Sequence, residues 1–249
     1  MNKLSKTIAI IPSRLESTRL PNKAITDICG LPMIIHVYKR CLLSKTLDEV
    51  YVATDSLTIS KIVKLYGGNV IMTSSSHQTG TDRIAEASIN LDCEFVVNVQ
   101  GDEALLDPNH IDKIICELKQ NSNIDVALLV SPYSNNNIPS DIKVVLNNNN
   151  DVMYLSRSDI PSDTRTIGPP KLKAYHVVNF RKDFLLKYSK WKKTALEEIE
   201  SNEYIRILEH GYNIRAVHVE SDAISVDTED DLEYVRNKMK TDFWFSKYK

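Results

Sequence analysis

The stretch Phe95-Val96-Val97-Asn98-Val99-Gln100-Gly101-Asp102-Glu103 decides the fold class of this chain. Its first five residues are almost all apolar, and a glutamine, a glycine and two acids follow them, which is typical of a buried strand that runs into a loop. In sheets built from such strands, ligands bind beyond the carboxyl ends. The stretch therefore predicts a strand over Phe95–Val99 and a functional loop directly after it.

Short apolar runs alternate with helical patterns on both sides of this strand. The expected strands before it are Thr7–Ile11, Val50–Thr54 and Val70–Thr73. One expected helix begins at Pro32, and others cover Ile59–Tyr66 before the strand and His110–Lys119 after it. Alternation of this kind indicates an α/β fold with a parallel sheet covered by helices on both faces.

The pattern changes near residue 126. Two strands, Lys143–Leu146 and Val152–Leu155, flank the turn-forming run Asn147–Asn150 and predict a hairpin. The remaining expected elements are the strands Val126–Val130, Tyr175–Phe180 and Ile214–Val219 and the helices Phe184–Tyr188, Ala195–Glu209 and Thr228–Met239. We expect residues 1–249 to form a single domain with a short tail over 241–249.

Composition excludes several classes of protein. The chain has 249 residues, 42% hydrophobic and 26% charged, with a net charge of −2, so we expect a globular protein without general affinity for nucleic acid. No apolar run reaches the ~18–20 residues that span a bilayer, and the polar start does not resemble a signal peptide, so we expect no integral membrane contact. The four cysteines form no CxxC pair, which indicates reduced thiols in a cytoplasmic protein.

A basic loop follows the first strand. Arg14, Arg19 and Lys23 lie within ten residues in Ile11-Pro12-Ser13-Arg14-Leu15-Glu16-Ser17-Thr18-Arg19-Leu20-Pro21-Asn22-Lys23. A triphosphate carries about four negative charges, so several cations must face it, and the Arg fork and the Lys point charge both suit phosphate oxygens. The alternative is a basic loop that is simply solvated.

Two acids stand at the ends of expected strands or before helices. Asp102 follows Phe95–Val99, and Asp227 lies in Ser225-Val226-Asp227-Thr228. Mg²⁺ prefers one or two carboxylates together with phosphate oxygens and water, so the pair predicts a magnesium site if the two converge. The alternative for each is a helix N-cap.

Arg83 closes the polar stretch His77-Gln78-Thr79-Gly80-Thr81-Asp82-Arg83 at the start of a helix. It could hold a substrate carboxylate bidentately, or it could be an exposed arginine of a helix start. The sequence contains no GxGxxG and no GxxxxGK[ST] motif, so dinucleotide and P-loop binding are not supported.

At these residues the sequence resembles the 3-deoxy-manno-octulosonate (Kdo) cytidylyltransferases, also called CMP-Kdo synthetases. The resemblance runs in the order of the family from about residue 7 to residue 239. It rests on Ile11–Arg14, Ser17–Lys23, Gly30–Ile34, Val52–Asp55, His77–Arg83, Val97–Glu103, Leu155–Arg157 with Ile160-Pro161, and Val226–Thr228.

The resemblance implies a GT-A-like nucleotide-diphospho-sugar transferase fold, a sugar-binding and dimerisation region over about 126–215, a homodimer, CTP and Mg²⁺. By the same resemblance, the nucleotide-binding positions are Pro12, Ser13, Arg14, Arg19, Lys23, Gln78, Thr79 and Gly80. Arg14, Arg19, Lys23 and Asp102 match catalytic positions, and Asp102 and Asp227 match the magnesium ligands. Arg83, Gln100 and Glu203 match positions that face the sugar acid.

The chain departs from the family on the sugar side. The family carries His-Leu-Gly-Ile-Tyr where this chain has Ala174-Tyr175-His176-Val177-Val178, so its sugar-binding His and Tyr fall on Ala174 and Val178. His176 shares a strand face with both and could replace part of the lost contact. Ala104 stands where the family has proline. We expect transfer of CMP from CTP to the anomeric hydroxyl of Kdo or a modified Kdo.

Two other functions stay open at this point. The same fold could act on another acidic sugar or a sugar phosphate, or the chain could be a nucleotide-binding homologue without activity, although a scaffold needs neither Asp102 nor Asp227. The tail Phe243-Trp244-Phe245-Ser246-Lys247-Tyr248-Lys249 is expected to pack on its own domain or on a partner subunit. On that interpretation, its removal leaves the chemistry intact.

Overall fold

The computed structural model describes residues 5–17, 19–135, 138–162, 164–166, 168, 170–221 and 223–249, and for His176 it describes only the backbone. Within these residues, one sheet has the strand order β11-β7-β10-β6-β1-β4-β5, and β8 and β9 join it through β10. Its strands are β1 (Thr7–Ser13), β4 (Glu49–Thr54), β5 (Asn69–Met72), β6 (Phe95–Val99), β7 (Val126–Tyr133), β8 (Lys143–Leu146), β9 (Val152–Ser156), β10 (Lys171–Arg181) and β11 (Arg215–His218).

The core of the sheet is parallel, as the alternating sequence pattern predicts. β1 pairs in parallel with β4 and with β6, and β4 pairs in parallel with β5. β10 is antiparallel to both β6 and β7, and β7 is parallel to β11. The predicted hairpin is confirmed, because β8 and β9 pair antiparallel across Asn147–Asn150. A separate small sheet joins β2 (Asp27–Ile28) to β3 (Leu31–Pro32).

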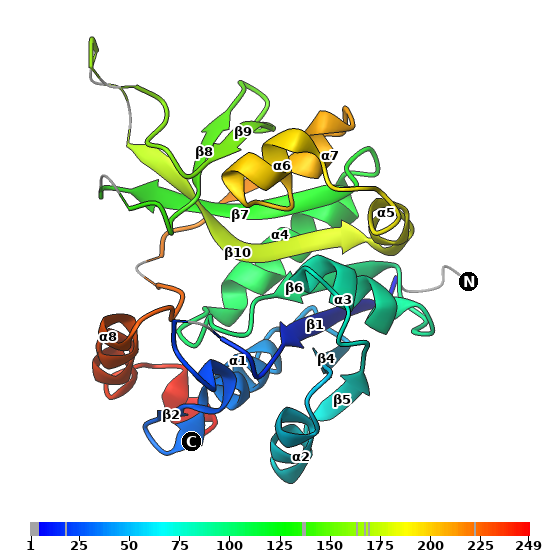
Figure 1. Cartoon of the computed structure of the whole chain (residues 1–249), viewed down its shortest axis with the longest axis vertical. Helices are drawn as coiled ribbons and strands as arrows, with labels where there is room; N and C mark the ends of the chain where they lie inside the picture. The colour runs from blue at the N-terminus through cyan, green and yellow to red at the C-terminus, as the bar shows by residue number, and fades with distance from the viewer. Residues whose placement is uncertain are drawn as a thin grey trace.

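Helices cover both faces of the sheet (Figure 1). They are α1 (Met33–Cys41), α2 (Leu57–Leu65), α3 (Gly80–Ser88), α4 (Pro108–Gln120), α5 (Lys182–Tyr188), α6 (Ala195–Glu200), α7 (Ile205–Glu209) and α8 (Glu229–Met239), with short 3-10 turns η1 (Lys23–Ile25) and η2 (Phe245–Lys247). No helix in the described part of the chain is long and apolar enough to cross a membrane.

Strand alternation divides the interior into two large hydrophobic clusters. In β1, Ala9 and Ile11 join the cluster that packs under α1, α2 and α4, whereas Ile8 and Ile10 join the cluster under α3, α5 and α7. Successive side chains of a strand point to opposite faces, so a strand buried on both sides must be apolar throughout. This explains why the strands of the parallel core read as unbroken apolar runs.

One predicted element is wrong. The sequence pattern predicts a continuous helix over Ala195–Glu209, but the structure divides it into α6 and α7. Ser201 ends α6 with a left-handed backbone, φ 47° and ψ 47°, and the side chain of Asn202 accepts a hydrogen bond from the backbone N–H of Tyr204. The Asn202 side chain offers the backbone a partner outside the helix, which favours a break. The break turns residues 201–204 toward the site described below.

Candidate active site

A cavity of about 740 Å³ lies beyond the carboxyl ends of β1 and β6. Its walls come from the loop after β1, the loop after β6, the start of α3, the break between α6 and α7, and the segment before α8. The chain thus forms a ligand-sized cavity at the edge of the sheet where the sequence predicts functional loops.

Two glycines let these walls approach closely. A Cβ atom on Gly101 would lie 3.1 Å from the carbonyl oxygen of Pro12, and a Cβ on Gly80 would lie 3.2 Å from the Pro12 ring. Both distances are shorter than most Cβ contacts, so a Cβ at either position would require its neighbour to shift by a few tenths of an ångström. Glycine at these positions therefore keeps the loop after β6 and the start of α3 against the end of β1.

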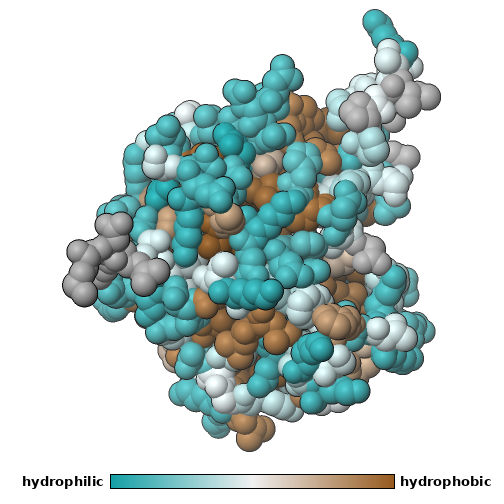
Figure 2. All heavy atoms as spheres, turned by 180° about the vertical axis from the view of Figure 1, so that it is seen from behind, coloured by the Kyte–Doolittle hydropathy of each residue, from teal (hydrophilic) through white to brown (hydrophobic). Residues whose placement is uncertain are grey.

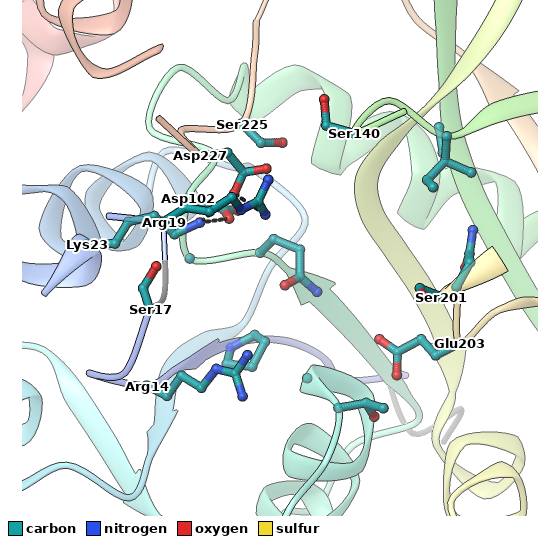
Figure 3. A pocket seen from close by; sticks show the side chains of 18 of the residues that line it. Arg14, Ser17, Arg19, Lys23, Asp102, Ser140, Ser201, Glu203, Ser225 and Asp227 are labelled. Atoms are coloured by element: carbon teal, nitrogen blue, oxygen red, sulfur yellow. Dashed lines mark hydrogen bonds and ion pairs between the residues drawn. The ribbon is translucent and has the colours of Figure 1, made fainter. Parts of the chain in front are cut away.

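Lys23, Asp102 and Asp227 meet at one end of the cavity, although 204 positions separate the first from the last (Figure 3). The Nζ of Lys23 lies 2.6 Å from Oδ2 of Asp102 and 3.0 Å from Oδ1 of Asp227. Burial opposes the charge of Lys23, but the two carboxylates outweigh it and raise the pKa of the ammonium. The group therefore stays charged between the carboxylates near neutral pH.

The helix-cap alternatives fail for both acids. α4 is capped by Asp107, and α8 is capped by Thr228 in a capping box with Asp231, so neither Asp102 nor Asp227 serves as a cap. The backbone N–H of Val226 donates to the carbonyl of Asp102 at 3.2 Å, which holds the two segments together. Both carboxylates thus remain available to the cavity.

The predicted phosphate loop places its cations at two positions. Arg19 is 60% exposed, and its Nη2 lies 3.0 Å from Oδ1 of Asp227, beside Lys23. Arg14 lines the cavity further along, apart from this cluster (Figure 3). The loop is therefore not simply solvated, since all three cations face one cavity. Pro12 and Ser13 line the same wall at the end of β1.

The predicted nucleotide positions Gln78, Thr79 and Gly80 also line the cavity. The Thr79 hydroxyl accepts a hydrogen bond from the backbone N–H of Asp82 at 3.1 Å and so caps α3. His77 pairs with Glu86, which also accepts hydrogen bonds from the backbone N–H of Ser74. These contacts fix the loop that leads into α3 at the cavity wall.

Arg83 is buried, so it is not an exposed arginine of a helix start. Its Nη1 donates to the hydroxyl of Thr73 at 2.7 Å and lies 3.4 Å from a carboxylate oxygen of Asp55. The side chain lines the cavity, and Asp55 already offsets part of its charge. Asp55 was not singled out from the sequence as a site residue.

Gln100 and Glu203 line the cavity as the resemblance implies. Gln100 donates to the side-chain oxygen of Asn98 at 3.2 Å, and Asn98 in turn donates to the hydroxyl of Tyr204. Glu203 points toward the cavity (Figure 3), and its Oε2 has no hydrogen-bond partner among the described residues. Burial raises the pKa of the Glu203 carboxyl.

The two altered positions on β10 differ in their surroundings. Both are buried in the hydrophobic cluster under α3, α5 and α7, but Ala174 also lines the cavity, whereas Val178 is absent from the described cavity wall. The pairing of β10 with β7 shifts between Tyr175 and Val178. The side chain of His176, which the sequence places in the sugar site, lies outside the described part of the structure.

Two residues of the matched stretches, Glu103 behind Asp102 and Arg157 in the cavity wall, were not among the site residues that the sequence predicts. Glu103 is buried beside Asp102, its carboxylate accepts from the hydroxyl of Ser225, and burial together with the Asp102 charge raises its pKa to about 8. Arg157 donates to the carbonyls of Pro139, Glu200 and Ser201, and so ties β9 to the helix break. Such contacts depend on which loops meet in space, and no local pattern reports them.

Comparison with known proteins gives the relationships of the chain. Residues 8–216 match the family described as "Cytidylyltransferase". A "3-deoxy-manno-octulosonate cytidylyltransferase" of Geobacter metallireducens is 39% identical over 94% of this chain and 98% of its own length. The Escherichia coli protein of the same name is 37% identical over 95% and 97%.

A solved structure of a CMP:2-keto-3-deoxy-manno-octonic acid synthetase complexed with CTP superposes with a TM-score of 0.91 at 36% identity, covering 95% of this chain and 99% of that one. A 4-diphosphocytidyl-2C-methyl-D-erythritol synthase from Anaerococcus prevotii, 16% identical with a TM-score of 0.63 over 95% and 99%, shares the fold. With this agreement in sequence, fold and cavity position, the chain is a nucleotidyltransferase that belongs to the 3-deoxy-manno-octulosonate cytidylyltransferase family.

Proposed function

We propose that the chain transfers CMP from CTP to the anomeric hydroxyl of a 3-deoxy-2-ulosonic acid, Kdo or a modified Kdo, and releases pyrophosphate. The observation that carries the proposal is the convergence of Lys23, Asp102 and Asp227 in a cavity that also receives Arg14 and Arg19. The names of the relatives and the CTP complex of the structural neighbour support the choice of nucleotide and acceptor.

The reaction balances without a covalent enzyme intermediate. The anomeric oxygen forms a bond to the α-phosphorus, the bond from that phosphorus to the bridging oxygen breaks, and the hydroxyl proton leaves to solvent. Chemistry of this type depends on positioning and on neutralising charge. Arg14, Arg19 and Lys23 supply positive charge to the departing pyrophosphate, and Arg83 lies where it can pair with the carboxylate of the acceptor.

Asp102 and Asp227 would hold Mg²⁺, the cofactor of this proposal. The pair fits the ion because two carboxylates leave room for phosphate oxygens and water, and because Lys23 already places a positive charge between them. In the described part of the chain, no three His, Cys, Asp or Glu side chains gather into an all-protein metal site. When bound there, the ion would orient the phosphates and lower the pKa of the attacking hydroxyl.

The acceptor end of the cavity favours a ligand that differs from Kdo. Ala174 offers no side-chain hydrogen bond at the position where the family has a histidine. At the nucleotide end, by contrast, all the residues that the resemblance assigns to nucleotide binding line the cavity. A pocket that lacks one partner loses discrimination for the hydroxyl that this partner would bind. We therefore propose a modified Kdo as the preferred acceptor.

A pyrophosphate-release screen tests the function. Purified protein is assayed with CTP, with and without Mg²⁺, against a panel of 3-deoxy-2-ulosonic acids, and UTP and ATP serve as nucleotide controls. We expect turnover that needs CTP, Mg²⁺ and one of the acids. Release that does not depend on an acid, or equal turnover with UTP and ATP, would contradict the proposal.

We also propose that the protein works in the cytoplasm as a homodimer formed through residues 126–215. All four cysteines are unpaired in the structure, which suits a reducing compartment. Met153, Leu196 and Ile199 are large apolar side chains of this region that remain exposed in the single chain.

A further inference from the structure

A third, smaller hydrophobic cluster lies apart from the two that cover the sheet. The ring of Phe245, from the C-terminal tail, packs against it. Its buried members are Leu20, Ile28, Met33, Ala104, Val226, Leu232, Val235 and Met239. Figure 1 shows the C-terminus, α8 and β2 gathered at the same corner of the molecule.

This cluster, which we call the corner cluster, is adjacent in sequence to all three residues that meet in the cavity. Leu20 precedes Lys23 by three positions, Ala104 follows Asp102 by two, and Val226 directly precedes Asp227. Lys23 and Asp227 lie outside the strands of the main sheet. The corner cluster is therefore the apolar support on which those two segments rest.

A buried polar network joins the same segments to the tail. The Tyr248 hydroxyl lies 2.9 Å from Nδ1 of His36 and accepts from Nε of Arg40 at 3.2 Å. His36 contacts the carbonyl of Ile28 at 2.7 Å through Nε2, and Arg40 donates from Nη1 to the carbonyl of Leu106 at 2.9 Å. The His36 and Arg40 side chains, both on α1, thereby connect the tail to the loops that follow Lys23 and Asp102.

The donors and acceptors of this network are matched. A carbonyl only accepts, so Nε2 of His36 carries the proton that it donates to Ile28, and Nδ1 of the neutral ring accepts from the Tyr248 hydroxyl. Arg40 also donates from Nη2 to Asp242, the residue that leads into the tail. His36 and Arg40 are both fully buried. Loss of the Tyr248 hydroxyl would leave two buried polar groups without this partner.

We propose that Tyr248 is a positioning residue, which holds Lys23, Asp102 and Asp227 in their productive arrangement through His36, Arg40 and the corner cluster. The inference rests on the proposed function and replaces the expectation that the tail is dispensable for the chemistry. A brace is needed because Lys23 and Asp227 lie outside the strands of the main sheet, and reactions that depend on positioning are sensitive to displacements of about 1 Å.

Tyr248→Phe is the sharpest test, because it removes the hydroxyl and keeps the ring that contacts His36 and Phe245. Phe243→Ala is the matched control, since Phe243 is 62% exposed and its ring contacts Trp244 and Lys247 within the tail. We expect kcat for pyrophosphate release to fall about tenfold in Tyr248→Phe, with KM for CTP nearly unchanged, and both constants to stay at the wild-type value in Phe243→Ala.

Amide hydrogen exchange supplies a readout that does not depend on activity. In Tyr248→Phe, we expect faster exchange confined to residues 20–28, 101–106 and 224–228, with β4, β5 and β7 unchanged. Unchanged exchange in those three segments, or an increase spread over the whole sheet together with a fall in Tm, would overturn the positioning role. If the wild type shows no turnover with any acceptor, the proposed function fails, and the exchange pattern still decides the role of Tyr248.

Discussion

At the scale of single residues, the site depends on two carboxylates that share one ammonium. Asp102 and Asp227 both contact Nζ of Lys23, and neither is used as a helix cap. Asp102→Asn and Asp227→Asn keep the shape of the side chain and remove its charge. We expect each to lower kcat at least about 100-fold and to leave the Tm within a few degrees of wild type.

Asp230→Asn is the matched control for these two variants, because Asp230 is an exposed acid in the first turn of α8, close in sequence to Asp227. Pyrophosphate release and thermal melting are measured on all three proteins. Turnover near the wild-type value in both site variants would remove the metal assignment, whatever the control does.

Ala174 gives a second prediction at this scale. It lines the cavity at the position to which the family resemblance assigns a histidine, so Ala174→His should raise kcat/KM for Kdo relative to acids modified at the distal carbons. Val178→Tyr should not help, because Val178 is buried in the core and a larger ring would overpack it at a cost of about 1–3 kcal/mol. The measurement is kcat/KM for each acceptor. Kdo handled best by the wild type, with no gain in Ala174→His, would show that the acceptor is not shifted.

The sequence predicts which residues line the cavity where those residues follow the end of a strand, and it predicts them poorly elsewhere. Asp102 and the loop that carries Lys23 follow strands whose carboxyl ends lie at one edge, so the sequence predicts that both loops hold functional residues at that edge. Arg157 lines the same cavity only because β9 lies against the break after α6, and that contact depends on the tertiary arrangement. For Val178, strand alternation predicts the correct face of the sheet, but it does not predict that the side chain lies in the core rather than at the cavity wall.

At the scale of elements, the capping box of α8 determines where Asp227 stands. The Thr228 side chain accepts from the backbone N–H of Asp231, and the Asp231 carboxylate accepts from the backbone N–H groups of Thr228 and Asp227. We expect Thr228→Val to destabilise the fold by about 1 kcal/mol, or roughly 2–4 °C in Tm, and to reduce kcat because Asp227 loses part of its support.

Thr241→Val is the control, because Thr241 follows the other end of α8 and its hydroxyl makes only an exposed 3.4 Å contact with the carbonyl of Lys238 in the described structure. Thermal melting and steady-state kinetics are compared for the two variants. An equal, small effect of both substitutions would mean that the cap does not support the site.

The break between α6 and α7, where the sequence predicts one continuous helix, belongs to the same scale. The sequence pattern predicts one helix over Ala195–Glu209, and Gly211 lies just beyond its end, so the break at Ser201 goes against the local periodicity even though the Asn202 side chain favours it. The break is supported from outside, since Arg157 donates to the carbonyls of Glu200 and Ser201. Local propensity was overridden by tertiary contacts that place Glu203 at the cavity.

At the scale of the whole molecule, the sheet order separates a parallel half from a half in which parallel and antiparallel pairs are mixed. β1, β4, β5 and β6 form the parallel half that the sequence predicted in full, and β7 to β11 form a mixed half with the antiparallel β10 and the projecting hairpin. Buried parallel strands are recognisable as continuous apolar runs in the sequence. The strand pairing of the mixed half depends on contacts between distant segments, which local hydrophobic periodicity does not reveal.

The mixed half also carries the surface that we expect to form the dimer. Figure 2 shows apolar areas between hydrophilic side chains on the back of the molecule. Exposed apolar residues are thus not confined to one place, and the location of the dimer interface needs a direct test. Ile199 on α6 is 76% exposed, and Met153 on β9 and Leu196 on α6 are also exposed in the same region. A stable dimer buries about 800 Å² per partner, with apolar side chains at its centre.

A charge at Ile199 would have to be buried without a partner if this region forms the interface, and such burial is strongly unfavourable. We therefore expect Ile199→Glu to convert a dimer to monomer at micromolar concentration in sedimentation equilibrium. Leu65→Glu on α2 is the matched control, because Leu65 is 81% exposed, also apolar, and outside residues 126–215. It should leave the dimer intact. A wild-type monomer, or dissociation by Leu65→Glu rather than by Ile199→Glu, would show that the subunits do not meet through the mixed half.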